Sequence, residues 1–474
     1  MNVAYLYPWD VVGDPSAPGR LADLGVQAVA LAASYHSTRA ATPYHPAHRV
    51  LDVPYPAFYL PIRPSSWSRL VPAAPTWTPA DAYLQARDAL KAVGLQVHAW
   101  TVLTHNSHLG TANPDLVVRN AFGDPYPYAL CPAHEDVIEY CENLVKEILE
   151  LAEPDGLILE ACGPMGFGHQ SVHEKTSGAD WTAVDTDLLS LCFCTKCAPH
   201  YPETTRAQIR ATIDNRHTHT HTHTHTHTHT HTHTHTHTDS ANLRSSSSST
   251  ATTYPHNTPT HVPPHNTPTH IHPSSPIPTD QPTATNTNTN TATATNRATA
   301  TATNTTDGTS SNSVTTPQPP PITIEDALAP LTDEIRNIRV ALSTTLRQRL
   351  ITAARETAPK VPITLHANPN PWATGAFAPL PTGEPAADVL VANCWGDPTT
   401  DATRLARLKE LATPPQRVGA YVLALPPRPA DPEILADQLR TYAKAGASEF
   451  HLYHAGLASP RRLAALVQAL ALLP

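Results

Sequence analysis

Eight short apolar segments alternate with longer amphipathic segments along this chain, and this alternation limits the possible folds more than any other feature. Each apolar segment has the length and the side-chain content of a β-strand. The strand-like segments are 2–8, 26–35, 95–103, 155–163, 361–369, 387–396, 417–425 and 449–456. Between them, the apolar residues of 133–152 and of 331–357 fall on one helical face. Glycines that close helices precede several strands: Gly25, Gly94 and Gly446.

Strict alternation of strands and helices predicts an α/β fold of the (β/α)8 type, the TIM barrel, in which parallel strands close on themselves and helices cover them. The alternative is a doubly wound open sheet. A glycine-rich phosphate loop after the first strand would favour that sheet, but the chain there reads YPWDVVGDP. We therefore expect the barrel.

A long polar segment interrupts the pattern between the fourth and fifth strand-like segments. Residues 216–322 contain eleven consecutive His-Thr dipeptides and then Ser-, Pro-, Asn- and Thr-rich repeats. This segment has too few apolar residues for their burial to offset the conformational entropy lost on ordering. We therefore expect a disordered insertion. Residues 1–215 and 323–474 would then form the two parts of one barrel. The histidines could bind nickel or zinc loosely, but repeat expansion in a surface loop explains them more simply.

Charge and the first residues exclude several classes of protein. The net charge is -9, with no basic excess that would favour a nucleic-acid partner. The opening MNVAYLYPWD lacks the basic and apolar regions of a signal peptide, and no apolar run approaches the ~18 residues that span a membrane. We expect a soluble cytoplasmic protein with reduced cysteines and no membrane partner. The oligomeric state stays open.

Aromatic and polar residues follow the predicted strands, where a barrel places its active site. Aromatic faces stack on sugar C–H groups and imidazoles bind hydroxyls, so these residues predict a pocket for a small-molecule or oligosaccharide substrate. The candidate ligand-binding residues are Tyr7, Trp9, His36, Arg63, Trp100, His105, Asn106, His366, Asn368, Trp395, Tyr453 and His454. For any single ring, the alternative is a packed or solvated loop side chain.

Glu160 is the carboxylate placed directly at a predicted strand end, in DGLILEACG. Partial burial there would raise its pKa, as a general acid requires. The alternative is a structural ion pair with Arg39 or Arg63. Glycoside hydrolysis also needs a second carboxylate. Asp10 and Asp397 are the candidates, followed by Asp124, Glu174 and Asp180.

Residues 95–160, about a seventh of the chain, resemble the family-ten glycosyl-hydrolase-like proteins. The shared order is GLQVHAW, NPDLVVRN, LCPAHEDVIEYCENLVKEIL and DGLILE. The resemblance implies a sugar-processing barrel and places Glu160 at the first aspartate of the family's DGIHFDDY strand. Ala161 replaces the second aspartate, and His366 stands where related glycosidases often have an acid. The whole chain also resembles a group of alanine-rich actinobacterial proteins.

Three of the seven cysteines form a tight motif, CFCTKC, at Cys192, Cys194 and Cys197. This C-x-C-x2-C spacing is typical of a structural zinc site, which needs a fourth ligand. Cys131, Cys162 and His200 are the candidates, and Cys131 is favoured because the arrangement resembles the structural zinc cluster of some barrel β-galactosidases. Zinc would hold the loop after the fourth strand. The alternative is three unligated cysteines. We expect no organic cofactor.

Three functional hypotheses follow. The first is a glycoside-hydrolase-like enzyme with Glu160 as general acid/base and Asp10 or Asp397 as nucleophile or base. The second is a noncatalytic carbohydrate-binding barrel that lacks the carboxylate pair. The third, a metal-dependent hydrolase with His36, His366 and His454 as ligands, is less favoured because the paired His-x-His strand motif is missing.

Overall fold

The computed structural model describes residues 1–169, 175–221, 322–380 and 387–473. The chain divides into two units, of which the first comprises residues 1–224 and 300–474. The second unit, 225–299, lies outside the described residues. The predicted disorder of the insertion therefore concerns residues that are almost all outside the description, and the boundaries of the three predicted parts stay a prediction.

Eight parallel strands close into a barrel, as predicted. Each pairs with two neighbours, and β1 closes the ring by pairing with both β2 and β14. The barrel strands are β1 (Asn2–Leu6), β2 (Ala28–Tyr35), β6 (Gln96–Val102), β9 (Gly156–Glu160), β10 (Ile363–Asn368), β12 (Val389–Cys394), β13 (Arg417–Leu423) and β14 (Glu449–Tyr453). All eight lie within the predicted segments. An open sheet is excluded because its first strand would have an unpaired edge.

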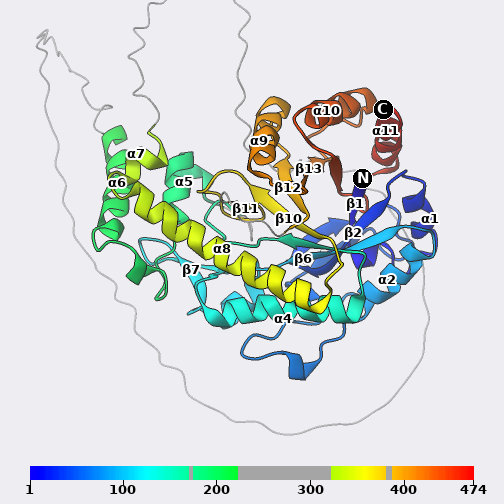
Figure 1. Ribbon diagram of the computed structural model, residues 1–474, viewed down its shortest axis with the longest axis horizontal. Coiled ribbons are helices and arrows are strands. Elements are labelled where there is room, and N and C mark those ends of the chain that lie inside the picture. The colour runs from blue at the N-terminus through cyan, green and yellow to red at the C-terminus, as the bar shows by residue number, and fades with distance from the viewer. Residues whose placement is uncertain (170–174, 222–321, 381–386, 474) are drawn as a thin grey trace, which may run out of the picture. The chain divides into compact units, whose positions relative to one another are not determined.

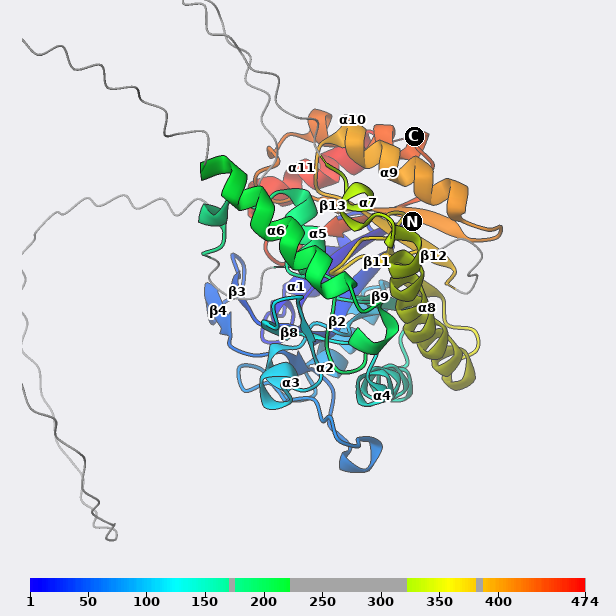
Figure 2. The same cartoon turned by 90° about the vertical axis from the view of Figure 1, so that its left-hand side faces the viewer.

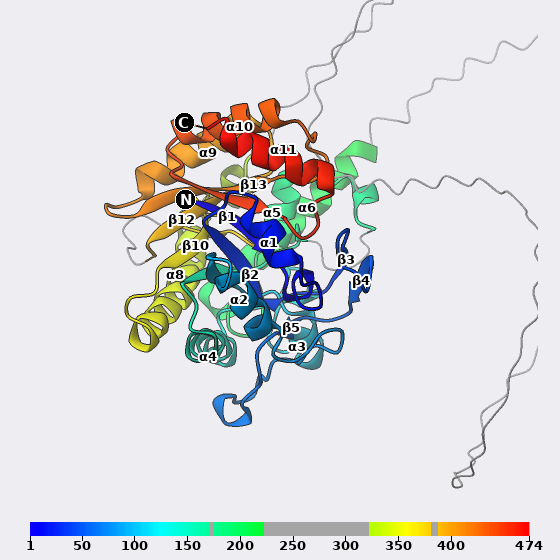
Figure 3. The same ribbon diagram turned by 90° about the vertical axis from the view of Figure 1, so that its right-hand side faces the viewer.

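Helices cover the outside of the barrel (Figures 1 and 3). They are α1 (Ala17–Ala22), α2 (Ala82–Lys91), α4 (Glu135–Ala152), α8 (Thr332–Thr357), α9 (Pro398–Leu411), α10 (Pro432–Lys444) and α11 (Pro460–Ala471). The predicted helical segments 133–152 and 331–357 correspond to α4 and α8, which lie side by side. The described residues between β10 and β12 contain only the short strand β11 (Ala378–Pro379) and no helix. That connection is rich in proline, which lacks the N–H that a helix interior needs.

The crossover from β9 to β10 contains several helices and the insertion. Besides α8, its helices are α5 (Ala183–Leu189), α6 (Thr205–His221) and α7 (Ile324–Leu328). Helix α6 continues past the predicted boundary at residue 216, and Figure 2 shows it beside α5 and α7. The remaining elements are the one-turn helices η1 (Pro8–Asp10), η2 (Pro64–Ser66), η3 (Ser177–Ala179) and η4 (Ala198–His200), helix α3 (Ser107–Ala112), strand β5 (Ala57–Phe58), and the hairpins β3 (Thr38–Ala41) with β4 (Val50–Val53) and β7 (Val117–Arg119) with β8 (Pro125–Leu130).

The lumen of the barrel is unusually polar. Alternate residues of a barrel strand point inward, and branched apolar side chains usually fill the centre. Here, polar and aromatic side chains occupy several inward positions. They are Tyr5, His98, Trp100, Glu160, His366, Tyr421, Glu449, His451 and Tyr453. None of the described helices is long and apolar enough to cross a membrane.

Candidate active site

Glu160 lies at the carboxyl end of β9, in the end of the barrel that we call the mouth. Its Oε2 accepts a hydrogen bond from the indole N–H of Trp100 at 2.6 Å and lies 3.3 Å from Nδ1 of His366. These partners come from β6 and β10, the strands on either side of β9. The glutamate is only 8% exposed. Closure of the barrel therefore supplies the groups that hold this carboxylate.

The alternative hypothesis of a surface ion pair at Glu160 is wrong. Arg39 pairs with Asp52 in the β3–β4 hairpin. Arg63, a predicted ligand-binding residue, binds Glu147 of α4 outside the barrel.

The expected rise in the pKa of Glu160 is also wrong. Burial does raise the pKa, but the nearby His366, the Trp100 N–H and the charge of His36 act in the other direction. Together they outweigh burial, so the pKa of Glu160 lies below its usual value. An ionised carboxylate at neutral pH suits a nucleophile or a general base rather than a general acid.

Aromatic side chains surround this carboxylate. The hydroxyl of Tyr7 lies 3.1 Å from that of Tyr35 and 3.3 Å from that of Tyr453. The ring of Trp100 meets Tyr35 edge-on at 4.6 Å, and the ring of Trp395 lies 4.9 Å from Tyr453. Four of these five residues were predicted from sequence, and the structure brings them together. We call these five residues the aromatic belt.

Three histidines form a cluster beside the aromatic belt. Nε2 of His169 lies 3.1 Å from Nδ1 of His105, and the ring of His36 lies 4.4 Å from that of His105. Burial lowers the pKa of each of them, so all three are neutral near pH 7. A neutral imidazole can both donate and accept a hydrogen bond, as recognition of a sugar hydroxyl requires.

His454 completes the mouth. Its ring packs against that of Tyr7 at 4.2 Å, and neither ring nitrogen has a hydrogen-bond partner among the described residues. Burial lowers the pKa of His454 to about 3. The imidazole is therefore neutral near pH 7.

Asp10 ends the one-turn helix η1, just after β1, and its carboxyl lines a cavity beside helix α1 instead of the lumen. Its Oδ2 accepts the backbone N–H of Tyr7 at 2.8 Å, while its buried Oδ1 has no hydrogen-bond partner among the described residues. The carboxyl lines a cavity of about 20 Å³, which has room for about one water molecule. Burial raises the pKa of Asp10 to about 7, and the Tyr7 N–H only partly opposes it.

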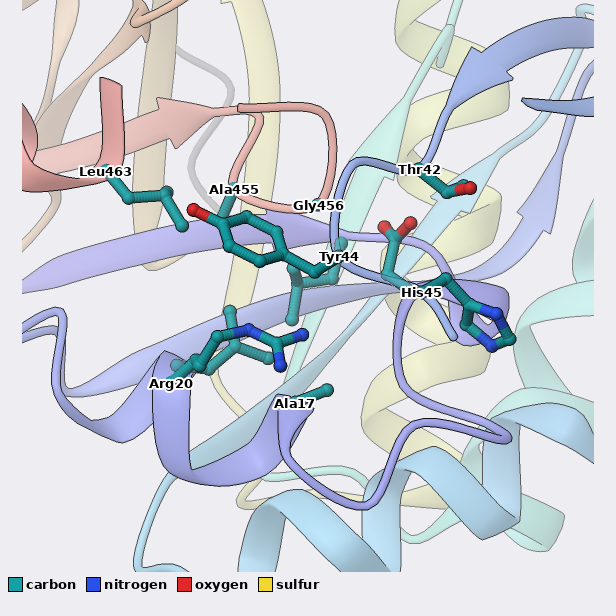
Figure 4. A pocket seen from close by; sticks show the side chains of 11 residues that line it. Ala17, Arg20, Thr42, Tyr44, His45, Ala455, Gly456 and Leu463 are labelled. Carbon is teal, nitrogen blue, oxygen red and sulfur yellow. The ribbon is translucent and has the colours of Figure 1, made fainter. Parts of the chain in front are cut away.

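Figure 4 shows that this cavity lies between helix α1 and the loop after β14. Tyr44 lies over Arg20 on one side, and Ala455 and Gly456 lie on the other. A Cβ atom on Gly456 would lie 1.9 Å from Oδ2 of Asp10, so only glycine fits there. None of the cavity's lining residues belongs to the aromatic belt or the histidine cluster.

Several other predicted site residues have local structural contacts. Asp397 is exposed and caps α9, where its Oδ1 accepts the N–H groups of Thr399 and Thr400. Asn106 caps α3 in the same way through the N–H of Leu109. Asn368 accepts the N–H of Asn370. These three polar side chains thus satisfy backbone donors at turns and helix starts.

The remaining candidates do not complete a carboxylate pair. Trp9 is buried and stacks on the outer face of the belt at Tyr7. Asp124 and Asp180 are exposed, and Glu174 lies outside the described residues. No contact among the described residues brings a second carboxylate against Glu160.

Sequence reasoning missed other members of the site. Tyr421 and His169 line the mouth, and Tyr5 and His451 lie deeper in the lumen. The available signal was the period of two along each strand, since Glu449, His451 and Tyr453 alternate with Phe450 and Leu452. Reading only strand ends overlooked it.

Four buried cysteines gather outside the lumen. The Sγ atoms of Cys131, Cys192, Cys194 and Cys197 all lie within 4.8 Å of one another. Cys131 lies 3.5 Å from Cys197 and 3.7 Å from each of the other two. Tetrahedral zinc with Zn–S bonds of about 2.3 Å separates its sulfurs by about 3.8 Å, so the cluster fits this metal. Of the proposed fourth ligands, Cys131 is the one that joins the motif.

Among the described residues, these cysteines are the only group whose atoms converge as metal ligands. His36, His366 and His454 do not converge, which removes the basis of the metal-dependent hydrolase hypothesis. Cys162, a candidate fourth ligand, is buried elsewhere, as are Cys141 and Cys394.

No protein-family model matches this chain, and no curated protein matches it either. Its resemblances to the family-ten and actinobacterial proteins therefore stay predictions. Solved structures similar to the chain include the PgaB (BpsB) glycoside hydrolase domain from Bordetella bronchiseptica, at 14% identity and a TM-score of 0.49, covering 100% of this chain and 99% of that one.

A second similar structure is the catalytic domain of β-amylase from Paenibacillus polymyxa, at 12% identity and a TM-score of 0.46, covering 100% of this chain and 99% of that one. A third is α-L-fucosidase isoenzyme 2 from Paenibacillus thiaminolyticus, at 9% identity and a TM-score of 0.46, covering 99% of this chain and 48% of that one. At these identities and TM-scores, the likenesses assign no activity to this chain.

Proposed function

We propose that this barrel binds a carbohydrate at its mouth and hydrolyses a glycosidic bond with Glu160 acting in its ionised form. The observation that carries the proposal is the position of Glu160: a buried carboxylate at a strand's carboxyl end, held by Trp100 and His366. The aromatic belt offers faces for a sugar ring, and the histidine cluster offers donors and acceptors for its hydroxyls.

The lowered pKa of Glu160 supports a function as nucleophile or general base. This assignment differs from the general acid that its sequence position suggested. A retaining mechanism would have the carboxylate attack the anomeric carbon, and an inverting mechanism would have it take a proton from water.

Aryl glycosides test the proposal because a nitrophenolate leaving group needs no general acid. We expect the full-length protein to cleave at least one dinitrophenyl glycoside of a panel, and Glu160→Ala to lose that activity. If Glu160 is the nucleophile, azide should restore turnover in Glu160→Ala and yield a glycosyl azide of inverted configuration. Full activity in the Glu160→Ala variant would refute the proposal.

A noncatalytic carbohydrate-binding barrel is the second candidate function. The observation in its favour is that neither Asp10 nor Asp397 contacts Glu160 or its partners. In that case, no glycoside in the panel should be cleaved, while glycans should still bind to the protein and to Glu160→Gln with similar affinity.

We also propose that the cysteine cluster holds a structural Zn²⁺. A Zn²⁺ ion bound to four thiolates would tie the end of β8, at Cys131, to the loop after α5. We expect the purified protein to contain one zinc per chain by mass spectrometry of the metal, and Cys197→Ser to contain none. Cys141→Ala is the matched control, since Cys141 is a buried thiol outside the cluster. Equal zinc in Cys197→Ser would refute the site.

The cytoplasm remains the proposed compartment. None of the seven cysteines forms a disulfide, which supports a reducing environment. Fractionation of the producing cell would test this compartment directly.

A further inference from the structure

A continuous column of polar side chains crosses the barrel lumen from the mouth to the opposite end, which we call the floor. It begins at Glu160 and His366, which are 3.3 Å apart. The Tyr5 hydroxyl then lies 2.9 Å from Nε2 of His366 and 3.2 Å from Nδ1 of His451. Nε2 of His451 lies 3.5 Å from Glu449.

The column ends at the floor, at the first residues of two strands. Glu449 begins β14, and its carboxylate lies 3.0 Å from Nε of Arg417, which begins β13. The arginine side chain is 50% exposed, whereas that of Glu449 is 2% exposed. At the floor, Arg417 is therefore the member of the column in contact with solvent.

Small residues make room for this column. A Cβ atom on Gly419 of β13 would lie 3.0 Å from the Val391 side chain and 3.2 Å from the His451 ring. Gly156 of β9 similarly leaves space for His98, whose ring would lie 2.8 Å from a Cβ there. Glycine at these inward positions allows imidazoles to pack where branched apolar residues usually fill a barrel.

The hydrogen-bonding capacity of Tyr5 restricts how protons are placed in the column. A phenol donates one proton, yet the Tyr5 hydroxyl meets a nitrogen of His366 and a nitrogen of His451. It can donate to one imidazole only, so the other must donate to it. The second nitrogen of each imidazole lies 3.3 Å (His366) or 3.5 Å (His451) from a carboxylate oxygen. Neither contact is a hydrogen bond in the structure, but the negative charge at that distance favours a proton on the nitrogen. The imidazole that donates to Tyr5 is then protonated on both nitrogens.

Among the groups in direct contact, the charges balance with the same number of protons. Glu160 and Glu449 are both buried carboxylates, and Arg417 is the cation in direct contact with the column. One additional positive charge, on either His366 or His451, makes the whole column neutral. A neutral set avoids the high cost of an uncompensated buried charge.

We propose that His366, Tyr5 and His451 share one proton between the two carboxylates, and that Tyr5, His451 and Glu449 are positioning residues for Glu160. In one state, His451 is the imidazolium and Tyr5 donates to Nε2 of His366. In the other, the proton on Nδ1 of His451 has moved to the Tyr5 oxygen, and the Tyr5 proton has moved to Nε2 of His366. The second state places a positive charge beside Glu160.

Other groups also act on the column. Burial raises the pKa of Tyr5, and the negative charges of Glu160 and Glu449 raise it further, as expected for a residue between the two carboxylates. The neighbouring ionisable groups are His36, Tyr35, Tyr421 and Tyr453 at the mouth and His98, Asp155 and the amino group of Met1 at the floor. All of these groups remain unchanged in the Glu449, Arg417 and Tyr5 variants below; Tyr421 is replaced only in a control.

Nuclear magnetic resonance of protein labelled with ¹⁵N-histidine tests the proposal without any substrate. The resonances of His366 and His451 are assigned by replacing each residue in turn. We expect Glu449→Gln to lower the pH at which the shared proton is lost, as detected at His366, by about one unit or more. Arg417→Gln should shift this pH upward, because it removes a cation instead of an anion. Arg417 is half exposed, so that variant provides the test if Glu449→Gln does not fold.

Tyr5→Phe separates transfer through the phenol from simple electrostatics. When Tyr5→Phe is combined with Glu449→Gln or Arg417→Gln, the change in the pH of proton loss at His366 should be at most half of that seen with Tyr5 present. Tyr421→Phe is the matched control, since its ring contacts both Tyr5 and His366 but its hydroxyl is outside the column. It should leave the response intact.

Two results would overturn the shared proton. One is a folded Glu449→Gln or Arg417→Gln variant in which the His366 resonances titrate as in the parent protein. The other is an unchanged response in Tyr5→Phe. The inference builds on the proposed function only in assigning Glu160 a catalytic role, and the two fail separately. A barrel without turnover can still show the relay, and an active enzyme can lack it.

Discussion

The barrel wall separates carboxylates that look alike in the sequence. Glu160 lies inside, where His366 and Trp100 hold its pKa below the usual value against the effect of burial. Asp10 lies outside, in a small cavity where burial raises its pKa to about 7. Asp397 is also outside and caps a helix. The comparison shows that proximity to a strand end does not determine the ionisation of a carboxylate. What determines it is whether the side chain lies inside or outside the barrel.

The largest difference should be in turnover. On whichever aryl glycoside the protein cleaves, Glu160→Gln should lower kcat about 10³-fold, because it removes the charge that attacks the sugar or activates water. Asp397→Asn should change kcat less than about twofold, since an asparagine also caps a helix. Steady-state kinetics of both variants provide the measurement. Comparable losses in both would show that the wall does not divide the carboxylates as we infer.

Acid stability should depend on the inner side of the wall. His454 is buried, and its pKa is lowered to about 3, so the unfolded chain binds a proton that the folded chain excludes. The stability that this neutral histidine allows is complete above pH ~6.5 and is lost as the pH falls toward 3. His454→Phe should therefore reduce the loss of unfolding free energy across this range by up to about 4 kcal/mol.

Urea unfolding at several pH values measures this effect. His98 should contribute in the same direction, because its pKa is lowered to about 4, chiefly by burial. The Phe variant at position 454 should thus retain part of the acid sensitivity. An unfolding free energy with the same pH slope in both proteins would contradict the assignment of His454 as a neutral buried group.

Asp10, outside the lumen, should show the opposite pH dependence. Its raised pKa means that the folded chain keeps a proton that the unfolded chain loses, so stability is greatest below pH ~3.8 and falls as the pH rises through about 7. Asp10→Asn removes this penalty and should raise the unfolding free energy at pH 8 by about 3 kcal/mol, with little change at pH 4. Urea unfolding of both proteins at pH 8 and pH 4 measures this difference. An equal stabilisation at the two pH values would mean that Asp10→Asn acts through side-chain packing and not through removal of a charge.

The smallest effect belongs to Asp397. Loss of its capping hydrogen bonds to Thr399 and Thr400 should cost about 1 kcal/mol of unfolding free energy in Asp397→Ala. Asp397→Asn should restore most of this stability. Thermal unfolding of the pair distinguishes a cap from a catalytic group. If Asp397→Asn keeps its stability but loses turnover, the sequence hypothesis for Asp397 is correct.

Much of the architecture could be predicted from the sequence because it depends on local patterns. Each strand has its own apolar run, and α4 and α8 have their own apolar faces. The position of Glu160 at the end of a strand follows from DGLILE. The cysteine motif also gathers three of its four sulfurs within six residues. The exception is the connection between β10 and β12, where prolines replace the expected helix among the described residues.

The partners of each functional group could not be predicted in this way. The column from Glu160 to Arg417 draws its residues from five strands, β9, β10, β1, β14 and β13, which become neighbours only when the barrel closes. Cys131 joins the other cysteines from more than sixty residues away. The pKa of Glu160 shows the consequence, since burial was foreseeable but His366 and Trp100 were not.

By itself, the sequence determined the number and order of the strands, the place of the insertion and the residue types available at the mouth, because periodicity and spacing are local properties of the chain. Only the tertiary structure decided which carboxylate lies inside the wall and which lies outside. Closure turns alternate residues of each strand to opposite sides, and it brings the charges and donors of distant strands within a few ångströms. Those distances, rather than residue type, set the ionisation of Glu160 and Asp10.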